Sequence, residues 1–158
     1  MAHIIRLRGP WEYEPLARVW IDAAGVRRES SESLPAAGKV HLPTDWGATL
    51  GTDFRGRVRY TRRFGLPTNL GPGETVWLVV EGVDSFGSLA LNNVSLGEMT
   101  GCQRIAEFEI TDLLAPRNLL QFDVELPCCE SPAAAPDRPG REHLPGGPIG
   151  EVDLEIRW

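Results

Sequence analysis

A tryptophan and an aspartate stand side by side in residues 43–51, which read PTDWGATLG and are predicted to form a loop. The flat face of an indole stacks on the C–H surface of a pyranose, while a carboxylate accepts hydrogen bonds from sugar hydroxyls. Asp45 and Trp46 therefore have the chemistry of a carbohydrate-binding site. The sequence leaves one alternative open, in which Trp46 folds back and caps the hydrophobic core.

Catalytic groups, by contrast, occur in no arrangement that supports a reaction. The three histidines are far apart in the sequence, with His3 and His41 in predicted strands and His143 in a predicted loop. The chain has no Gly-x-Ser-x-Gly, His-Glu-x-x-His or phosphate-binding glycine motif. Glycosidases need two carboxylates around a pocket, whereas most acids here alternate outward along predicted strands. We therefore predict a binding protein and not an enzyme, with no cofactor, no metal and no structural calcium.

Several arginines follow in residues 55–64. Because successive side chains of a strand point to opposite faces, four of these arginines share one face, which we interpret as a charged, solvated surface. They are Arg55, Arg57, Arg59 and Arg63. Arg62 falls on the apolar face, where an isolated charge is costly to bury, so we predict a mostly buried Arg62 with a carboxylate within ~4 Å. The candidate partners are Glu81, Asp84 and Asp123. A contact between Arg62 and a ligand is the alternative.

The elements that position these residues are predicted to be almost entirely β-strands. Apolar and polar residues alternate along most of the chain, which is the pattern of antiparallel strands with one buried and one solvated face. The predicted strands are residues 3–7, 18–21, 40–42, 57–66, 75–83, 88–92, 104–110, 118–126 and 149–158. Short strands at this spacing indicate an all-β antiparallel sandwich or jelly roll, formed by a single domain over residues 1–158.

Three tryptophans are predicted to lie in the core of this sandwich. Residues 75–83 are apolar on both faces, so we expect a central strand with Trp77 buried in it. Trp11 and Trp20 also fall on strand-like segments and are expected to be buried.

The turns of the chain are predicted from residues that tolerate unusual backbone angles. Asn92-Asn93 tolerates left-handed backbone and predicts a hairpin tip. One helical turn is expected at residues 111–114, capped by Thr111 or Asp112. Residues 127–148 are rich in proline and glycine, and a regular strand follows them, so we expect a long loop within the domain and not a tail.

Composition restricts the class of partner and the compartment. A net charge of −6 and a pI near 5.1 argue against nucleic acid, which is bound by neutralising phosphates. No apolar run is long enough to span a membrane, and no secretory signal is visible, so we expect a cytoplasmic protein. The cysteines Cys102, Cys128 and Cys129 cannot all pair within one chain and are expected to be free thiols.

Short motifs stand in a fixed order over nearly the whole chain. They are LxGxW at residues 7–11, VHLPTDW at 40–46, FRGRVRYTRRFGLP at 54–67, VVEGVD at 79–84, ALNNVSLGE at 90–98, FEITDLL at 108–114, NLL at 118–120 and GGPIGEVDL at 146–154. Their order resembles that of the N-terminal sugar-binding domain of family-two glycoside hydrolases, the β-galactosidase, β-glucuronidase and β-mannosidase group. The resemblance implies a galactose-binding-like jelly roll.

In that family the catalytic glutamates lie on a later barrel, and this domain supplies residues at the rim of the sugar pocket from two loops. The corresponding loops here are residues 44–53 and 128–148. The resemblance therefore implies a non-catalytic carbohydrate-binding module that binds a β-linked glycoside. Its expected site residues are Asp45, Trp46, Asp53, Arg141, Glu142 and His143.

A second hypothesis treats the chain as a structural or protein-interaction domain that has lost the sugar. At Pro148-Ile149-Gly150 the chain lacks the aromatic residue and the arginine that the family usually has near the isoleucine. Under this hypothesis, another chain contacts either the long loop or the face formed by Arg55, Arg57 and Arg59, with a C₂ homodimer as the default association. A third possibility is a subunit of a split glycosidase that associates with a separate catalytic chain.

Overall fold

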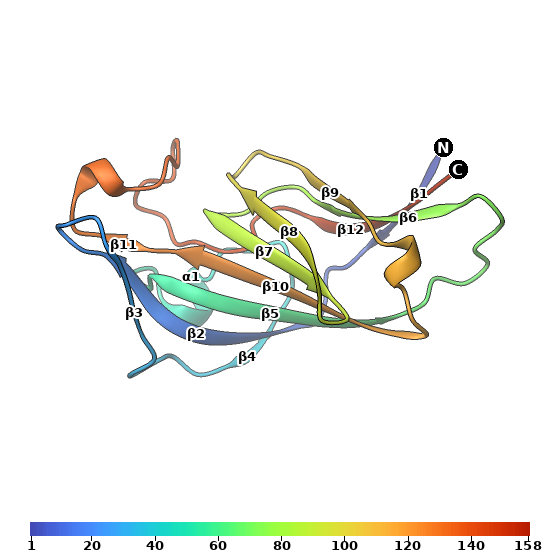
Figure 1. Ribbon diagram of the computed structural model, residues 1–158. Coiled ribbons are helices and arrows are strands. Elements are labelled where there is room, and N and C mark those ends of the chain that lie inside the picture. The colour runs from blue at the N-terminus through green and yellow to red at the C-terminus, as the bar shows by residue number, and fades with distance from the viewer.

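Two antiparallel β-sheets pack face to face in a computed structural model that describes all residues from 1 to 158 (Figure 1). The strands are β1 (Ala2–Arg6), β2 (Trp11–Ile21), β3 (Arg27–Ser30), β4 (Gly38–Val40), β5 (Gly56–Gly65), β6 (Thr75–Val80), β7 (Phe86–Leu91), β8 (Val94–Thr100), β9 (Ala106–Glu109), β10 (Arg117–Leu126), β11 (Cys128–Cys129) and β12 (Val152–Arg157). The helical segments are α1 (Gly47–Leu50) and the 3₁₀ turns η1 (Thr111–Leu113) and η2 (Pro132–Ala134). None of them is long and apolar enough to cross a membrane. The predicted all-β sandwich is confirmed.

The order of the strands places the longest ones at the centre of the larger sheet. That sheet runs β11-β2-β5-β10-β7-β8, with β3 and β4 also paired to β2, and the smaller sheet runs β1-β12-β6-β9. β5 and β10 pair along their whole lengths, from Gly56 opposite Leu126 to Gly65 opposite Arg117. Only the short β11 runs parallel to its neighbour β2.

The core lies between the sheets because alternate residues of each strand point inward. The apolar inward residues of β10 are all buried, and they are Leu120, Phe122, Val124 and Leu126. The smaller sheet supplies buried residues in the same way, from β12 with Val152, Leu154 and Ile156. Burial of such side chains between the two sheets is the main term that stabilises the sandwich.

The tryptophans divide between the two faces of the sheets. Trp11 is fully buried, as predicted, and its indole nitrogen donates to the carbonyl of Leu7 at 2.6 Å. The prediction for Trp77 is wrong, because Val76 and Leu78 are the inward residues of β6 and Trp77 points outward. There the guanidinium of Arg157 lies 4.6 Å from the centre of its ring, so a cation–π contact covers it. Trp20 is only half-buried.

The expected turns form, with one difference at the helical turn. Asn92 and Asn93 have φ angles of 51° and 66° at the tip of the β7–β8 hairpin, which confirms the prediction made there. The helical turn at η1 is also present, but no side chain caps it. The Thr111 hydroxyl instead accepts the backbone N–H of Val76 at 2.9 Å, which ties η1 to β6.

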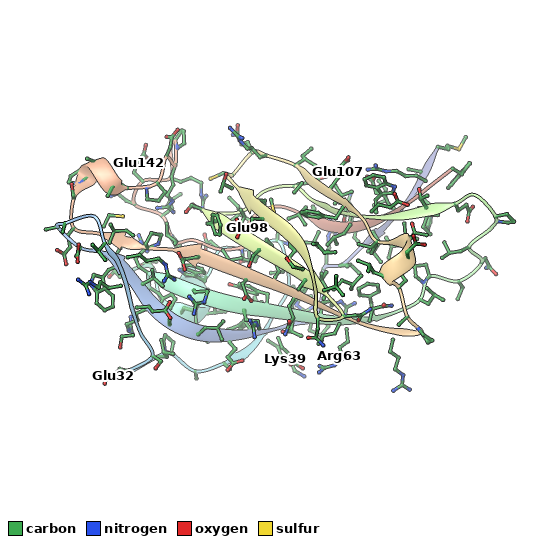
Figure 2. The ribbon with its side chains drawn as sticks, in the orientation of Figure 1. Glu32, Lys39, Arg63, Glu98, Glu107 and Glu142 are labelled. Atoms are coloured by element: carbon green, nitrogen blue, oxygen red, sulfur yellow. The ribbon has the colours of Figure 1, made fainter.

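Charged side chains on the outer face of the larger sheet neutralise one another. Arg59 donates two hydrogen bonds of 2.9 Å to Asp123 on the neighbouring β10. Arg57 pairs at 2.8 Å with Glu29 of β3, and Arg63 reaches away from the sheet into solvent (Figure 2). Arg57, Arg59 and Arg63 therefore form the charged face that the sequence predicts.

The prediction is wrong for Arg55, which does not belong to this face. Arg55 is half-buried, and its guanidinium donates to the carbonyls of Thr52 and Phe54 at 3.0 Å and 2.8 Å.

Asp153 is an exception among the charged residues, because it is buried without full pairing. It lies on the outer face of β12, is 3% exposed, and its Oδ1 atom has no hydrogen-bond partner. The nearest cation is Arg6, whose Nη1 is 3.7 Å from the other carboxylate oxygen. Burial raises the pKa of Asp153, since the ionised form is the more costly one to desolvate.

We predict that Asp153→Asn stabilises the fold and removes part of its pH dependence. Because the folded pKa of Asp153 is raised, the folded state holds the proton more tightly than the unfolded chain does. The stabilisation that comes from protonating Asp153 is greatest below the ordinary aspartate pKa of about 4. It is lost as the pH rises through the pKa that Asp153 has in the folded protein. Urea unfolding near neutral pH should show a gain on the order of 1 kcal/mol, which shrinks in acid.

Asp123→Asn is the matched control for this experiment, because Asp123 is fully paired with Arg59. We expect Asp123→Asn to lower the free energy of unfolding at neutral pH. A loss of stability in both variants would contradict the assignment of Asp153 as a destabilising charge.

Candidate functional site

The two loops that the resemblance places around a sugar lie side by side at one end of the sandwich. The N–H of Trp46 donates to the carbonyl of Gly146 at 2.9 Å, and that of Thr44 donates to Pro148 at 3.1 Å. Gly147 has φ +141°, and a Cβ at this position would lie 2.9 Å from the Thr44 carbonyl oxygen. Only glycine allows the loops to approach this closely.

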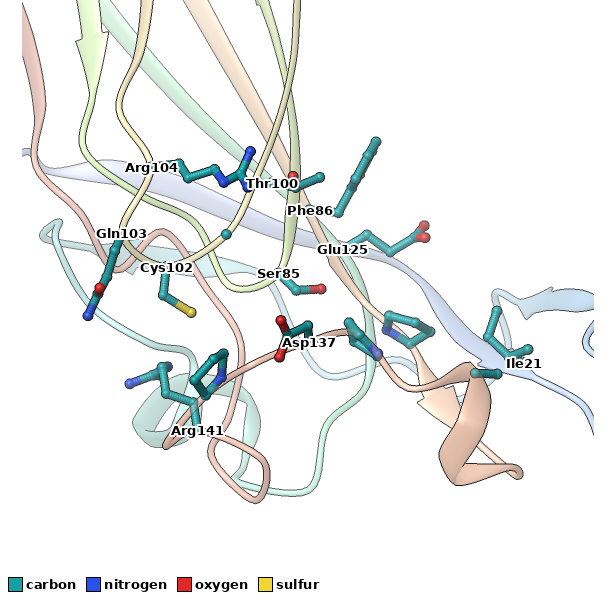
Figure 3. A pocket seen from close by; sticks show the side chains of 15 residues that line it. Ile21, Ser85, Phe86, Thr100, Cys102, Gln103, Arg104, Glu125, Asp137 and Arg141 are labelled. Atoms are coloured by element: carbon teal, nitrogen blue, oxygen red, sulfur yellow. The ribbon is translucent and has the colours of Figure 1, made fainter.

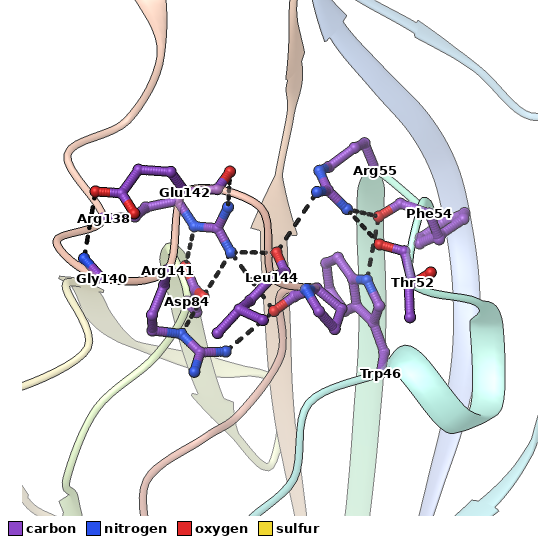
Figure 4. Close-up of polar contacts among 11 residues, drawn as sticks. Trp46, Thr52, Phe54, Arg55, Asp84, Arg138, Gly140, Arg141, Glu142 and Leu144 are labelled. Atoms are coloured by element: carbon purple, nitrogen blue, oxygen red, sulfur yellow. Dashed lines mark hydrogen bonds and ion pairs between the residues drawn. The ribbon is translucent and has the colours of Figure 1, made fainter.

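Trp46 is fully buried under this contact, so its expected stacking on a sugar must be corrected. Its indole N–H donates to the carbonyl of Phe54 at 3.2 Å, and the two rings meet edge to face with centroids 5.5 Å apart (Figure 4). The sequence could not distinguish this arrangement from an exposed loop tryptophan. A large apolar ring whose N–H finds a backbone carbonyl gains more from burial than from exposure, and Trp46 caps the core.

The other predicted site residues of these loops do not converge on one point. Asp45 is half-buried, and its Oδ1 accepts the N–H of Gly47 at 2.9 Å, which starts α1. Asp53 and His143 are exposed. Glu142 is also exposed, and hydrogen bonds from backbone N–H groups lower the pKa of its carboxyl. Only Arg141 lines the cleft described below.

A buried carboxylate organises the long loop. Asp84, which is 0% exposed, accepts two hydrogen bonds from Arg138, at 2.6 Å to Oδ1 and 2.7 Å to Oδ2. Arg141 adds a third, from its Nε to Oδ2 at 2.7 Å. Figure 4 shows both guanidinium groups approaching Asp84 from the same loop. We refer to these three residues as the ion cluster.

The same guanidinium groups also hold the backbone of the loop. Arg138 donates to the carbonyl of Leu144 at 2.6 Å, and Arg141 donates to that of Pro145 at 3.2 Å. A segment rich in proline and glycine has little regular structure of its own, so its backbone carbonyls lack the hydrogen bonds that neighbouring strands give each other. The two guanidinium groups supply these hydrogen bonds instead. The ion cluster therefore fixes the loop to the end of the sandwich.

Sequence reasoning missed this pairing because it considered Asp84 only as one of three candidate partners of Arg62. A usable signal was present: Asp84 directly follows the apolar segment 75–83, and the long loop contains only two arginines, Arg138 and Arg141. A buried acid with two cations on one otherwise irregular loop is a reason to expect that they meet.

Arg62 itself lies on the inward side of β5, opposite the buried Leu120, as its position in the strand predicts. It is half-buried, and the expected carboxylate within 4 Å is absent. Its Nε atom is buried without a hydrogen-bond partner. The position of Arg62 along β5 explains the correction. Arg62 lies opposite Leu120, which in turn lies opposite the last residue of β7, whereas Asp84 lies just before the start of β7. Another candidate partner, Asp123, is bound by Arg59.

A cleft of about 700 Å³ opens between the fixed loop and the adjacent strand ends (Figure 3). Asp137 and Arg141 line it on the loop side, and Phe86 and Thr100 on the strand side, with Gln103 and Arg104 at its edge. Phe86 is 36% exposed, which is unusual for a ring of this size. Asp137, Gln103 and Arg104 are exposed and make no side-chain hydrogen bond or ion pair within the chain.

The cleft holds groups suited to binding but no activated nucleophile. Burial raises the pKa of the Cys102 thiol, so the thiol stays protonated near neutral pH and is a poor nucleophile. Glu125, the cross-strand neighbour of Phe86, is already paired with Arg27. The exposed ring offers an apolar surface, and the free carboxylate, the amide and the two guanidinium groups offer hydrogen-bond acceptors and donors to a polar ligand.

Comparison with known proteins agrees with this fold. Residues 11–153 match the family described as glycosyl hydrolase 2 galactose-binding domain-like. The chain belongs to this family. No curated protein sequence matches the chain.

Solved structures with the same fold are enzymes of much greater length. The FMN-binding β-glucuronidase of Faecalibacterium prausnitzii L2-6 is 22% identical, with a TM-score of 0.72 over 98% of this chain and 22% of that one. The β-glucuronidase of Bifidobacterium dentium, complexed with coumarin-3-O-glucuronide, is 20% identical, with a TM-score of 0.69 over 98% of this chain and 30% of that one. A rhamnosidase of Novosphingobium sp. PP1Y is 18% identical, with a TM-score of 0.65 over 99% of this chain and 15% of that one. This family domain thus spans under a third of each of these enzymes.

We predict that Asp84→Asn is among the most destabilising single changes in the chain. It leaves Arg138 buried without a counterion, for which the expected loss is about 3–5 kcal/mol in urea or thermal unfolding. Arg138→Met should cost less, roughly 1–3 kcal/mol, because Asp84 keeps Arg141 as a partner. Asp53→Asn, a change at an exposed residue near the same loops, is the control and should leave the free energy of unfolding unchanged. If Arg138→Met lowers the free energy of unfolding more than Asp84→Asn does, the assignment of Asp84 as the central partner of the ion cluster is wrong.

Removing the charge of Arg62 is predicted to cost little stability, in contrast to the large loss predicted for Asp84→Asn. Arg62→Met keeps the apolar stem and removes the unpaired Nε, so the free energy of unfolding should stay within about 0.5 kcal/mol or rise. Arg59→Met is the comparison, because it breaks the two hydrogen bonds to Asp123 and should cost about 0.5–1 kcal/mol. A loss above about 2 kcal/mol for Arg62→Met would indicate a buried ion pair after all.

Proposed function

We propose that this domain is a non-catalytic carbohydrate-binding module that holds a β-linked glycoside in the cleft beside the ion cluster. The observation that carries the proposal is the exposed ring of Phe86 within a cleft lined by unpaired polar side chains. A sugar presents an apolar C–H face and a rim of hydroxyls, and this combination matches both. The structural neighbours named above are glycosidases, which supports a carbohydrate as the ligand class.

In this proposal each group in the cleft has a distinct role. Phe86 packs against one face of a pyranose, Asp137 accepts hydrogen bonds from hydroxyls, and Arg104 and Gln103 donate them. Arg141 is already oriented by Asp84, so its remaining N–H groups are held in place before the ligand arrives. The residues Asp45, Asp53, Glu142 and His143, which the sequence suggested, lie outside this cleft, and Trp46 lies in the core.

The chain supports binding better than catalysis. No pair of unengaged carboxylates lines the cleft, because Asp137 is the only acid there without a partner. We infer an accessory part of a glycoside hydrolase, in which a barrel elsewhere in the protein or on a partner chain carries out hydrolysis.

A second candidate function is a structural or protein-interaction domain. It is favoured by one specific observation, the direct hydrogen bonding of the two loops to each other, which leaves no gap between them for a sugar. Under this function the loop end of the sandwich would serve as a rigid contact surface. Sugar binding in the cleft distinguishes the two candidates.

The proposed function predicts saturable binding of simple glycosides to the isolated chain. Titration of methyl β-galactoside, β-glucuronide and β-mannoside, followed by calorimetry and by amide NMR shifts, should show at least one with a dissociation constant in the millimolar range or tighter. Phe86→Ala should weaken that binding about tenfold, the effect of losing about 1.4 kcal/mol of stacking.

His143→Ala and Asp53→Asn are the controls for this titration, because both residues are exposed but lie outside the cleft. Their binding should equal that of the unmodified chain. Absence of binding for all three glycosides at tens of millimolar, or equal binding by Phe86→Ala, would reject the cleft as a sugar site and favour the structural function.

A further inference from the structure

The strand β1 is the outermost strand of the smaller sheet, and one side of its backbone is open. It pairs with β12 in an uninterrupted antiparallel register from Ala2 opposite Arg157 to Arg6 opposite Asp153. Met1 exchanges backbone hydrogen bonds with Trp158, and the N–H of Leu7 donates to Val152. Hydrogen-bonded and non-hydrogen-bonded positions alternate along an antiparallel ladder. The backbone N–H and C=O groups of the odd-numbered residues of β1 therefore point toward β12. The N–H and C=O groups of Ala2, Ile4 and Arg6 therefore point away from the sheet.

Other edge strands carry features that discourage pairing with a further strand. β8 has an irregular register where it passes Leu89 and Ala90, and the outer residues of β9 are glutamates. β3 is mostly charged, with the sequence RRES, while β4 and β11 have only three and two residues. Charges, bulges and short length are the usual protections of an edge. β1 reads AHIIR, with no proline, no bulge and its single charge at the end.

An exposed apolar side chain marks the middle of this open edge. Ile4 is 46% exposed and lies on the outer face of the sheet, in register with Glu155. An isoleucine has high strand propensity, and here much of its side chain is open to solvent, which is a combination that promotes association between strands.

We propose that β1 is a self-association surface through which two copies of this chain join their smaller sheets. The two β1 strands pair antiparallel about a twofold axis at Ile4, so that Ile4 meets Ile4 of the second copy and Arg6 meets Ala2. No like charges stand opposite each other in this register, and each outward N–H finds a carbonyl. The proposal rests on the edge alone and is independent of sugar binding.

The strength of this association follows from its small contact area. Two strands of five residues bury less than a standard interface, so the dimer should be weak, with a dissociation constant on the order of 10–100 µM. The smaller sheet would then continue from one copy into the other, with the clefts of both copies left open.

Sedimentation velocity and light scattering over a range from about 1 µM to 1 mM test the proposal. The unmodified chain should shift from monomer to dimer across this range. Ile4→Lys should remain monomeric throughout, because a charge at the centre of the edge opposes pairing, while the new side chain faces Glu155 within its own sheet. Ile4→Pro is a second variant, since it removes an outward N–H that β12 does not use.

Ile105→Lys is the matched control, because Ile105 is 64% exposed in the loop between β8 and β9, outside this edge. It should dimerise like the unmodified chain, and thermal melts should show that all three variants are folded. A chain that stays monomeric at the highest concentration overturns the proposal. So does a dimer that survives Ile4→Lys, or one that Ile105→Lys abolishes equally.

Discussion

The buried carboxylate of Asp84 is the constraint on which the loop end of this protein depends. It has no contact with solvent and accepts three charge-assisted hydrogen bonds from two arginines of one loop. Such bonds are roughly twice as strong as neutral ones, and a carboxylate in this position cannot be left without them. A segment with little regular structure thereby acquires a fixed path, and Asp137, which stands next to Arg138, is placed at the cleft.

The ion cluster also links the core to the candidate binding surface. Asp84 exchanges backbone hydrogen bonds with Gly147, so the start of β7 and the end of the long loop are joined by both backbone and side chains. Trp46 is packed under the same loop, where a Cβ on Gly146 would lie 2.9 Å from its ring. Trp46, which resembles part of a sugar site in sequence, is thus a support of this region. The side chains that line the cleft come both from the long loop and from the strand ends beside it.

Sequence reasoning succeeded where the physical signal is local and repeated. The alternation in residues 118–126 and 152–156 fixes which side chains are buried, and the Asn92-Asn93 pair fixes a turn because few residues accept its backbone angles. It failed where the outcome depends on contacts between distant segments. Trp77 points outward because the residues on either side of it in β6 face the core. Of the acids expected near Arg62, Asp84 and Asp123 are bound by other arginines, and neither pairing can be read from local sequence. The cleft could not be foreseen at all, since its lining comes from five separate segments.

The place of the two chain ends has a mechanical consequence. Met1 and Trp158 lie next to each other, on the adjacent antiparallel strands β1 and β12 of one sheet (Figure 1). A force that pulls these ends apart acts along the hydrogen bonds between β1 and β12, so these hydrogen bonds break one after another, starting at the chain ends. Strands pulled past each other lengthwise must instead break many bonds at once. Under tension this domain would therefore release β1 first and at low force, while the larger sheet and the fixed loop stay intact.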